Sequence, residues 1–112
     1  MKIDFDNIDY EIKNNFNGGE KYFKLKSFND GLNKILIGKL EKGCSIGLHK
    51  HEGTSEIIHV ISGEGIMLCD GEEEILKPGD IHYCKNGHSH SFRNENDEDL
   101  IFFAVIPNHK EI

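Results

Sequence analysis

Apolar and polar residues alternate in short runs along most of the 112-residue chain. A period of two puts successive side chains on opposite faces of a β-strand, so each run predicts a strand with one face toward a core. The first run, residues 8–13, has the pattern of a half-buried strand. The predicted strands cover residues 8–13, 23–28, 32–41, 56–61, 66–69, 74–77, 88–94 and 100–106.

Turn-forming residues separate these runs. Asn, Asp, Gly and Pro gather at 14–19, 29–31, 70–71 and 77–80, and a charged stretch follows at 94–99. These residue types favour the backbone conformations of tight turns. Apolar residues do not repeat with the 3.6-residue period of a helix over any useful length. Short strands with turns about every 8–12 residues predict an all-β fold, an antiparallel sandwich or barrel.

Composition narrows the classes of protein. The chain has 37% hydrophobic and 29% charged residues, a soluble globular balance, and its length predicts one domain over 1–112. Its net charge of −7 argues against nucleic acid and anionic membranes as partners, since both require a basic face. No apolar run approaches the roughly 20 residues of a membrane span, and the start lacks the apolar core of a signal peptide. We therefore expect a cytoplasmic protein.

The three cysteines fit this location. Their number is odd and none are spaced as C-x-x-C, so we expect reduced thiols. Cys69 and Cys84 fall within apolar strand runs, and Cys44 lies beside the first histidine-rich segment. Each is predicted to pack as a small hydrophobic residue.

Three side chains of metal-ligand type lie close together within residues 43–63. His49 and His51 are two residues apart, so on a strand both imidazoles point to the same side. Glu56 begins the next apolar run and would project from a neighbouring strand. Two imidazole nitrogens and a carboxylate oxygen converging from two strands are what a divalent transition metal needs. With its flanking glycines, Gly43 and Gly63, the segment reads G-x5-H-x-H-x4-E-x6-G.

A second polar set follows downstream, with the spacing G-x7-G-x2-H-x3-N. His90 is its histidine, and closure of the sheet would bring it to the first three residues as a fourth ligand. His88 could share the face of His90, although a place at the pocket rim or on the surface suits it better. The other members of the set are Gly79, Gly87 and Asn94. No ligand role is expected of His59, His82 and His109.

The two sets resemble the two signature motifs of the cupin superfamily. The first matches at every position, and the second matches except that Lys85 stands where the family usually has proline. The resemblance covers roughly the C-terminal two-thirds of the chain and implies a double-stranded β-helix (jelly-roll) barrel. It also implies that Asn94 helps form the strand end, and that one metal ion is held by His49, His51, Glu56 and His90. Without the proline, the conformation of the loop at Lys85 is left open.

Three imidazoles and one carboxylate suit a divalent transition metal ion: Mn, Fe, Co, Ni or Zn. Such an ion keeps one or two positions for water or substrate and can orient a bidentate oxygen ligand. Tyr83, Cys84 and His88 are the polar groups expected to line the pocket.

Two classes of function follow. One is a metal-dependent enzyme acting on a small oxygen-rich metabolite, such as a sugar or a hydroxy- or keto-acid, with isomerase, lyase or dioxygenase chemistry. The other is a non-catalytic protein that binds metal or a small ligand. The intact ligand set favours the enzyme.

Strand alternation also predicts the oligomeric state. If Glu56 faces the interior, apolar side chains are left on the outside of the barrel, and residues 100–106 are apolar on both faces. Soluble monomers tend to avoid such an apolar patch, so we expect a homodimer. The alternative is that the N-terminal strands cover the patch. The residues predicted to face outward are Ile46, Leu48, Ile57 and Ile61, and those predicted to face inward are Ile58 and Val60.

Overall fold

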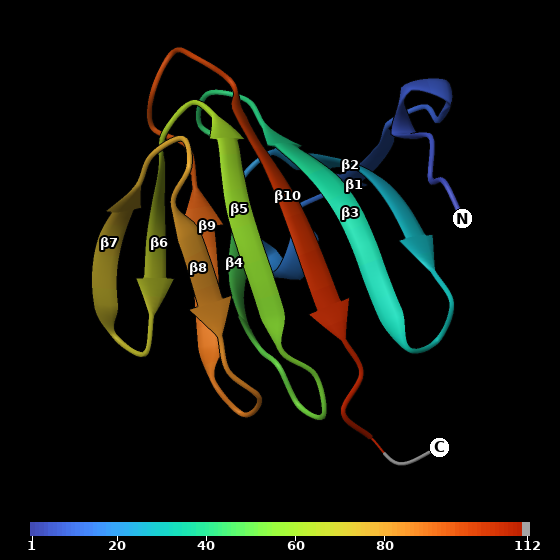
Figure 1. Cartoon of the computed structure of the whole chain (residues 1–112). Helices are drawn as coiled ribbons and strands as arrows, with labels where there is room; N and C mark the ends of the chain where they lie inside the picture. Colours follow the sequence, from blue (N-terminus) through green and yellow to red (C-terminus); the bar gives the residue numbers. More distant parts are fainter. Residues whose placement is uncertain (111–112) are drawn as a thin grey trace.

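The computed structural model describes residues 1–110, which form two antiparallel β-sheets (Figure 1). The strand order is β1-β2-β3-β10-β5-β8 in the six-stranded sheet and β4-β9-β6-β7 in the four-stranded sheet. The elements are η1 (Phe5–Asn7), β1 (Glu11–Asn14), η2 (Phe16–Gly18), β2 (Tyr22–Asn29), β3 (Asn33–Leu40), β4 (Ser45–Lys50), β5 (Glu56–Ser62), β6 (Gly65–Cys69), β7 (Glu72–Leu76), β8 (Ile81–Cys84), β9 (Ser89–Arg93) and β10 (Leu100–Pro107).

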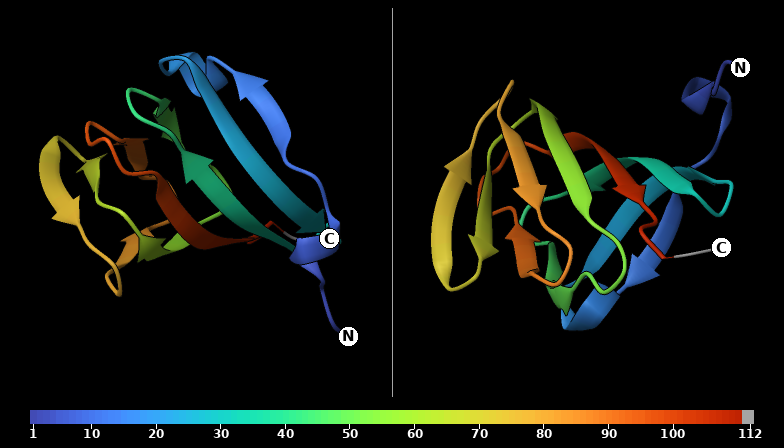
Figure 2. Two further views of the ribbon diagram at one scale, coloured as in Figure 1. Left: turned by 90° about the horizontal axis from the view of Figure 1, so that it is seen from above. Right: turned by 60° about the horizontal axis from the view of Figure 1, so that its bottom comes forward.

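The predicted all-β class is confirmed. The two sheets face each other across the interior, as the views from above and below show (Figure 2). Among residues 1–110, no ladder of backbone hydrogen bonds joins one sheet to the other, so the barrel is not closed. The helices here are two single turns, and none has the length and apolar character needed to cross a membrane.

The N-terminal strand differs from its prediction. Residues 5–7 form η1, the strand starts only at Glu11, and all four residues of β1 are exposed. Ile8 is 38% exposed and Ile12 is 57% exposed. A half-buried strand over 8–13 is therefore wrong. The physical reason is that β1 forms the edge of its sheet and pairs with β2 alone, so no second layer covers its apolar side chains.

The other predicted strands agree with the structure to within two residues at each end. The turn at Asp70-Gly71 also forms as expected, with positive φ at both residues (51° and 81°). These angles suit the tight two-residue connection of a hairpin. β6 and β7 therefore pair as neighbours along the whole of their length.

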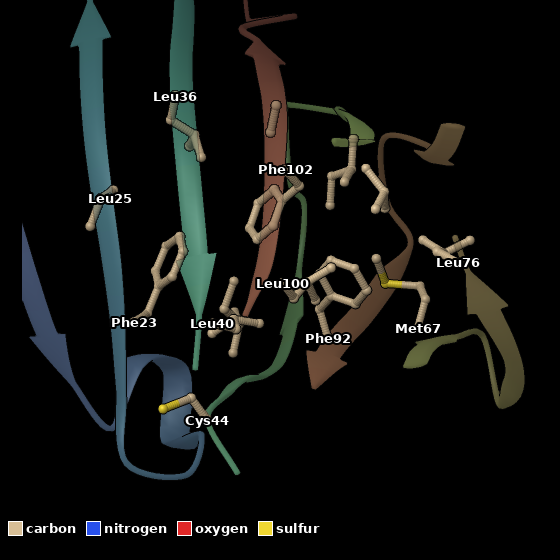
Figure 3. Packing of buried hydrophobic residues seen from close by; sticks show 14 residues of the cluster. Phe23, Leu25, Leu36, Leu40, Cys44, Met67, Leu76, Phe92, Leu100 and Phe102 are labelled. Carbon is tan, nitrogen blue, oxygen red and sulfur yellow. The ribbon is translucent and has the colours of Figure 1, made fainter. Parts of the chain in front are cut away.

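Phe102 on β10 lies at the centre of the core between the sheets (Figure 3). Its ring stacks on Phe23 at 6.0 Å and meets Phe92 edge-on at 5.3 Å, which joins the two sheets. Gly38 makes room for this ring, because an added Cβ would lie 2.3 Å from a Phe102 carbon. Burial of these apolar side chains is the main favourable term in folding, and it fixes the spacing of the sheets.

Strand β4 loses regular alternation just before the histidines. Ile46 pairs with Phe92 and His49 pairs with His90, so β4 has one more residue than β9 between the two pairs. This bulge changes which residues face the core. Leu48 is 61% exposed, as predicted, but Ile46 is 8% exposed and packs in the core, so its predicted outward orientation is wrong.

Candidate metal centre

The structure brings together the four residues that the sequence singled out. His49 and His51 come from β4 and the residue after it, Glu56 from the start of β5, and His90 from the middle of β9. One ligand atom from each residue lies within 4.8 Å of the others. Both sheets contribute residues to the cluster. The cluster therefore depends on how the two sheets face each other, as well as on the spacing of the four residues along the chain.

The distances between these atoms fit a metal ion. His90 Nε2 lies 3.1 Å from both His51 Nε2 and His49 Nε2. Glu56 Oε1 lies 3.1 Å from His51 Nε2 and 2.9 Å from His90 Nε2. Adjacent ligand atoms of an octahedral ion with bonds of about 2.1 Å are separated by about 3.0 Å. The cluster therefore has the size of the ligand shell of a transition metal ion.

The second nitrogen of each imidazole also has a partner. His49 Nδ1 donates to the Gly47 carbonyl at 2.8 Å, and because a carbonyl only accepts, Nε2 of neutral His49 presents its lone pair to the centre. His51 Nδ1 lies 3.0 Å from Thr54 Oγ1, and His90 Nδ1 lies 3.0 Å from His82 Nε2. Outer partners of this kind orient metal-binding histidines.

Burial and charge complement this geometry. Glu56 is 7% exposed, and burial alone would raise its pKa, but the adjacent imidazoles of His51 and His90 outweigh this and lower the pKa to about 2. Burial lowers the pKa of His49, so its imidazole is held in the neutral form that binds metal. The centre therefore offers one carboxylate and three imidazole nitrogens to a cation.

His82 is a member of the site that the sequence interpretation missed. Its side chain is 8% exposed and Nε2 faces His90 Nδ1. Burial, followed by the charge of His90, lowers the pKa of His82 to about 4. Neutral His82 can therefore accept the proton of His90 Nδ1. One feature of the sequence could have indicated that His82 is buried. It lies two residues before Cys84, so on a strand both side chains face the same side, and in β8 both face inward.

A pocket of about 650 Å³, counted to its open mouth, leads to the cluster. Its walls are mainly apolar, with Phe16 and Asn17 of η2 on one side. Lys34 is the one lining residue with a titratable side chain apart from the four of the cluster. Tyr83, Cys84 and His88, which were expected to line the pocket, do not: Tyr83 is 55% exposed, and His88 Nδ1 bonds Asp70 on the outside.

The model of a protein family described as "Cupin domain" matches residues 36–106, more than half of the chain. The chain belongs to the cupin family. This agrees with the resemblance seen in the two motifs.

Relatives of known structure or description include two matches from Thermotoga maritima. An oxalate-binding protein is 46% identical over 68 residues, which span 61% of this chain and only 56% of that relative. The crystal structure of a "predicted oxalate decarboxylase" is 32% identical, with a TM-score of 0.90 over 96% of this chain and 99% of the other. A sugar phosphate isomerase of the cupin superfamily from Silicibacter pomeroyi shares the fold, at 23% identity and a TM-score of 0.79 over 96% and 76% of the chains.

In this cupin the loop at Lys85 is held by hydrogen bonds in place of proline. Gly87 N donates to the His51 carbonyl at 2.6 Å, and His51 N donates to the His88 carbonyl at 2.9 Å. Asn86 Oδ1 accepts from Gly53 N at 2.9 Å. The loop is therefore tied to the backbone of a cluster residue.

Asn94 connects the ends of several strands. It is 1% exposed, and its Nδ2 donates to the carbonyls of Leu40 and Glu98, both at 2.8 Å. Its backbone also pairs with Gly43 and Cys44. These bonds agree with the strand-end role that the cupin resemblance implies.

Among the remaining histidines, His59 is exposed on β5 and His109 Nε2 contacts Ser55 Oγ at 2.8 Å, so both lie outside the cluster.

Proposed function

We propose that this cupin holds one divalent transition metal ion through His49, His51, Glu56 and His90, and that the ion binds a small ligand through two oxygen atoms. The convergence of three Nε2 atoms and one carboxylate oxygen, 2.9–3.1 Å apart, is the observation that carries the proposal. Four ligand residues leave up to two positions of an octahedral ion open. An ion with two open positions suits a bidentate oxygen ligand.

The pocket narrows the class of ligand. Beyond the four cluster residues its lining is apolar apart from Asn17 and Lys34. A ligand that fits has its oxygens at one end, as a 2-oxo or 2-hydroxy acid does, and an apolar remainder. The oxalate-binding relative supports a carboxylate at the metal end, and Lys34 adds one positively charged side chain to the pocket lining.

Elemental analysis of metal-loaded protein tests the metal centre. We expect His49→Ala to hold one ion per chain fewer than the wild type, because a ligand atom is removed. His59→Ala is a matched control, since His59 lies on the outer face of β5, away from the cluster. A folded His49→Ala protein that holds as much metal as the wild type would show that the ligands are wrongly assigned.

Calorimetry on metal-loaded and metal-free protein tests the ligand class. Oxalate and a series of 2-oxo acids with longer apolar side chains are the probes. We expect binding only in the presence of metal, and tighter binding as the apolar side chain grows, because each buried CH₂ contributes about 0.8 kcal/mol. Equal affinity with and without metal would exclude binding through the ion.

A metal-dependent enzyme is the second candidate, and the relative described as a predicted oxalate decarboxylase favours it. One observation argues against an enzyme. The other titratable residues of the pocket lining are the four proposed metal ligands, so Lys34 is the one lining residue that could transfer a proton without giving up a bond to the metal. A turnover screen on the same acids, with and without O₂, separates the two. Product formation that requires metal establishes the enzyme.

We also propose a homodimer, formed through the outer face of the six-stranded sheet. Ile57 and Ile61 on β5 are 41% and 48% exposed, and Ile81 and Tyr83 on the neighbouring β8 are 66% and 55% exposed. β1 and β2 continue this sheet beyond β3, at the edge away from β5 and β8, so these two strands leave the apolar face uncovered. A second copy placed on the same face would bury it.

A further inference from the structure

A second group of metal-ligand side chains lies behind the first. Cys69, His82 and Cys84 each offer one ligand atom within 4.8 Å of the others. His82 connects the groups, because its Nε2 faces Nδ1 of His90, the nitrogen directed away from the first centre. The second group shares no residue with the first and does not line the pocket.

The fold places these three residues in fixed positions. His82 and Cys84 are two residues apart on β8, and both are buried on its inner face. Cys69 ends β6 in the opposite sheet, where it pairs with His90, while Cys84 pairs with Glu56. Two rigid strands from different sheets therefore hold the two sulfur atoms near the same imidazole.

The two cysteines differ in burial. Cys84 is fully buried in the core, as predicted, although it lies outside the hydrophobic cluster that contains Cys44. Cys69 is only partly buried, so its predicted role as a small core residue is wrong. Their shared neighbour is a polar, buried imidazole.

We propose that Cys69, His82 and Cys84 form a second cation site, selective for a thiophilic ion such as Zn²⁺. Two thiolates and one imidazole are a ligand set that zinc takes, and they leave one of its four positions open. The Asp70 carboxylate lies next to the partly buried Cys69. Binding through His82 Nδ1 releases the two thiol protons and the Nδ1 proton of His82 to solvent, while His82 Nε2 still accepts from His90 Nδ1. The positive charge of the ion stabilises the anionic ligands that remain.

A disulfide between Cys69 and Cys84 is the competing outcome, and the experiment distinguishes it from an ion.

Cobalt absorption tests this site separately from the first. Sulfur-to-cobalt charge transfer gives a near-ultraviolet band that a centre made only of histidine and glutamate cannot produce. Co²⁺ added to metal-free, reduced protein should develop this band and reach two bound ions per chain, and Zn²⁺ should remove the band. The metal ions alone are the probes.

Variants assign the band. We expect Cys69→Ser and Cys84→Ser to lose it, and Cys44→Ser and His49→Ala to keep it. Cys69→Ser is the safer variant for folding because Cys69 is only partly buried.

Absence of the band in folded wild-type protein overturns the proposal, as does a band that survives Cys69→Ser. Loss of two free thiols from protein purified without reductant, measured by mass, would mean that the pair is a disulfide and would overturn it too. Loss of metal from His49→Ala bears only on the first centre.

Discussion

The hydrogen bond from His90 to His82 is the residue-scale feature with the clearest consequence. His82 Nε2, 3.0 Å from His90 Nδ1, fixes which nitrogen of His90 carries the proton and orients the ring. We expect His82→Leu, which keeps the bulk but removes the acceptor, to weaken metal binding at the first centre by about 10–100-fold.

Competition with a chelator measures that affinity. His59→Leu is the matched control and should leave the affinity unchanged, because His59 is exposed on β5. Cys84→Ser is a second control. It disrupts the second site by removing a sulfur but keeps the His82 imidazole, so it shows whether His82 affects metal affinity at the first centre directly or only through the second site. If His82→Leu binds metal as tightly as the wild type, His82 does not orient His90.

Metal affinity should also depend on pH in a defined direction. Burial lowers the pKa of His49 below the ordinary value of about 6.5, and the pKa of Glu56 is about 2, so Glu56 stays charged from pH 7.5 to pH 5. Protons therefore compete with the metal at His49 only below about pH 6.5. We expect constant affinity from pH 7.5 to pH 6.5 and a fall through pH 6 to 5.

The stability of the metal-free protein should change in the same direction. Because the folded-state pKa of His49 is lowered, its contribution is complete above the unfolded value and is lost as pH falls toward the folded one. Titrations with a metal indicator at several pH values measure the affinity. A flat profile between pH 7.5 and pH 5 would indicate a site that does not use histidine.

At this scale the sequence predicted the cluster but not its surroundings. His49, His51, Glu56 and His90 could be found because strand alternation and motif spacing describe them directly. For His82 the sequence contained only a signal that it faces inward with Cys84. Its contact with His90 depends on β8 lying across from β9, which spacing along the chain does not contain.

At the scale of elements, the turn η2 is fitted closely against β4. A Cβ added at Gly47 would lie 2.1 Å from the Asn17 carbonyl, and one added at Gly19 would lie 2.2 Å from the Ser45 carbonyl. η2 forms one wall of the pocket, and the Gly47 carbonyl holds His49. Because these two glycines have no side chains, η2, which forms one wall of the pocket, can pack directly against β4, the strand that carries His49.

Gly47→Ala tests this contact. The new methyl group would overlap backbone atoms that cannot rotate away, so η2 must move, and we expect a loss of about 1–3 kcal/mol in the free energy of unfolding and weaker metal binding. Urea unfolding measures the first effect and chelator competition the second. Leu48→Ala on the same strand is the control, since Leu48 is 61% exposed and should change stability by less than about 0.5 kcal/mol. Wild-type stability in Gly47→Ala would contradict close packing of η2.

Alternation predicted most strands because most have one buried and one exposed face. It was wrong at Ile46, where the bulge shifts the phase, and at β1, where the partner layer is missing. Both errors concern pairing between strands, which a periodic pattern in one strand does not record.

For the whole molecule, the apolar outer face of the six-stranded sheet is the feature that predicts assembly. Light scattering at micromolar concentration should give twice the chain mass of 12.7 kDa. Ile57→Lys should give monomers, because it would bury an unpaired charge in the interface. Ile75→Lys is the matched control, since Ile75 is equally apolar and 61% exposed but lies on β7 of the other sheet. A wild-type mass of 12.7 kDa would rule out the dimer.

The bulge in β4 also bears on how chain length can vary among cupins of this kind. The extra residue lies between Ile46 and His49, and both of these face inward. A deletion of one residue there would restore ordinary alternation and leave both residues facing the same way. A deletion within β9 has no such slack and would reverse the facing of the residues beyond it relative to His90. Strand β5 has an irregularity of its own, since Ile101 pairs with Ser62 and Phe102 with Val60, which leaves Ile61 as an extra residue. Of the three ligand strands, β4 and β5 can therefore change their residue count with less disturbance than β9.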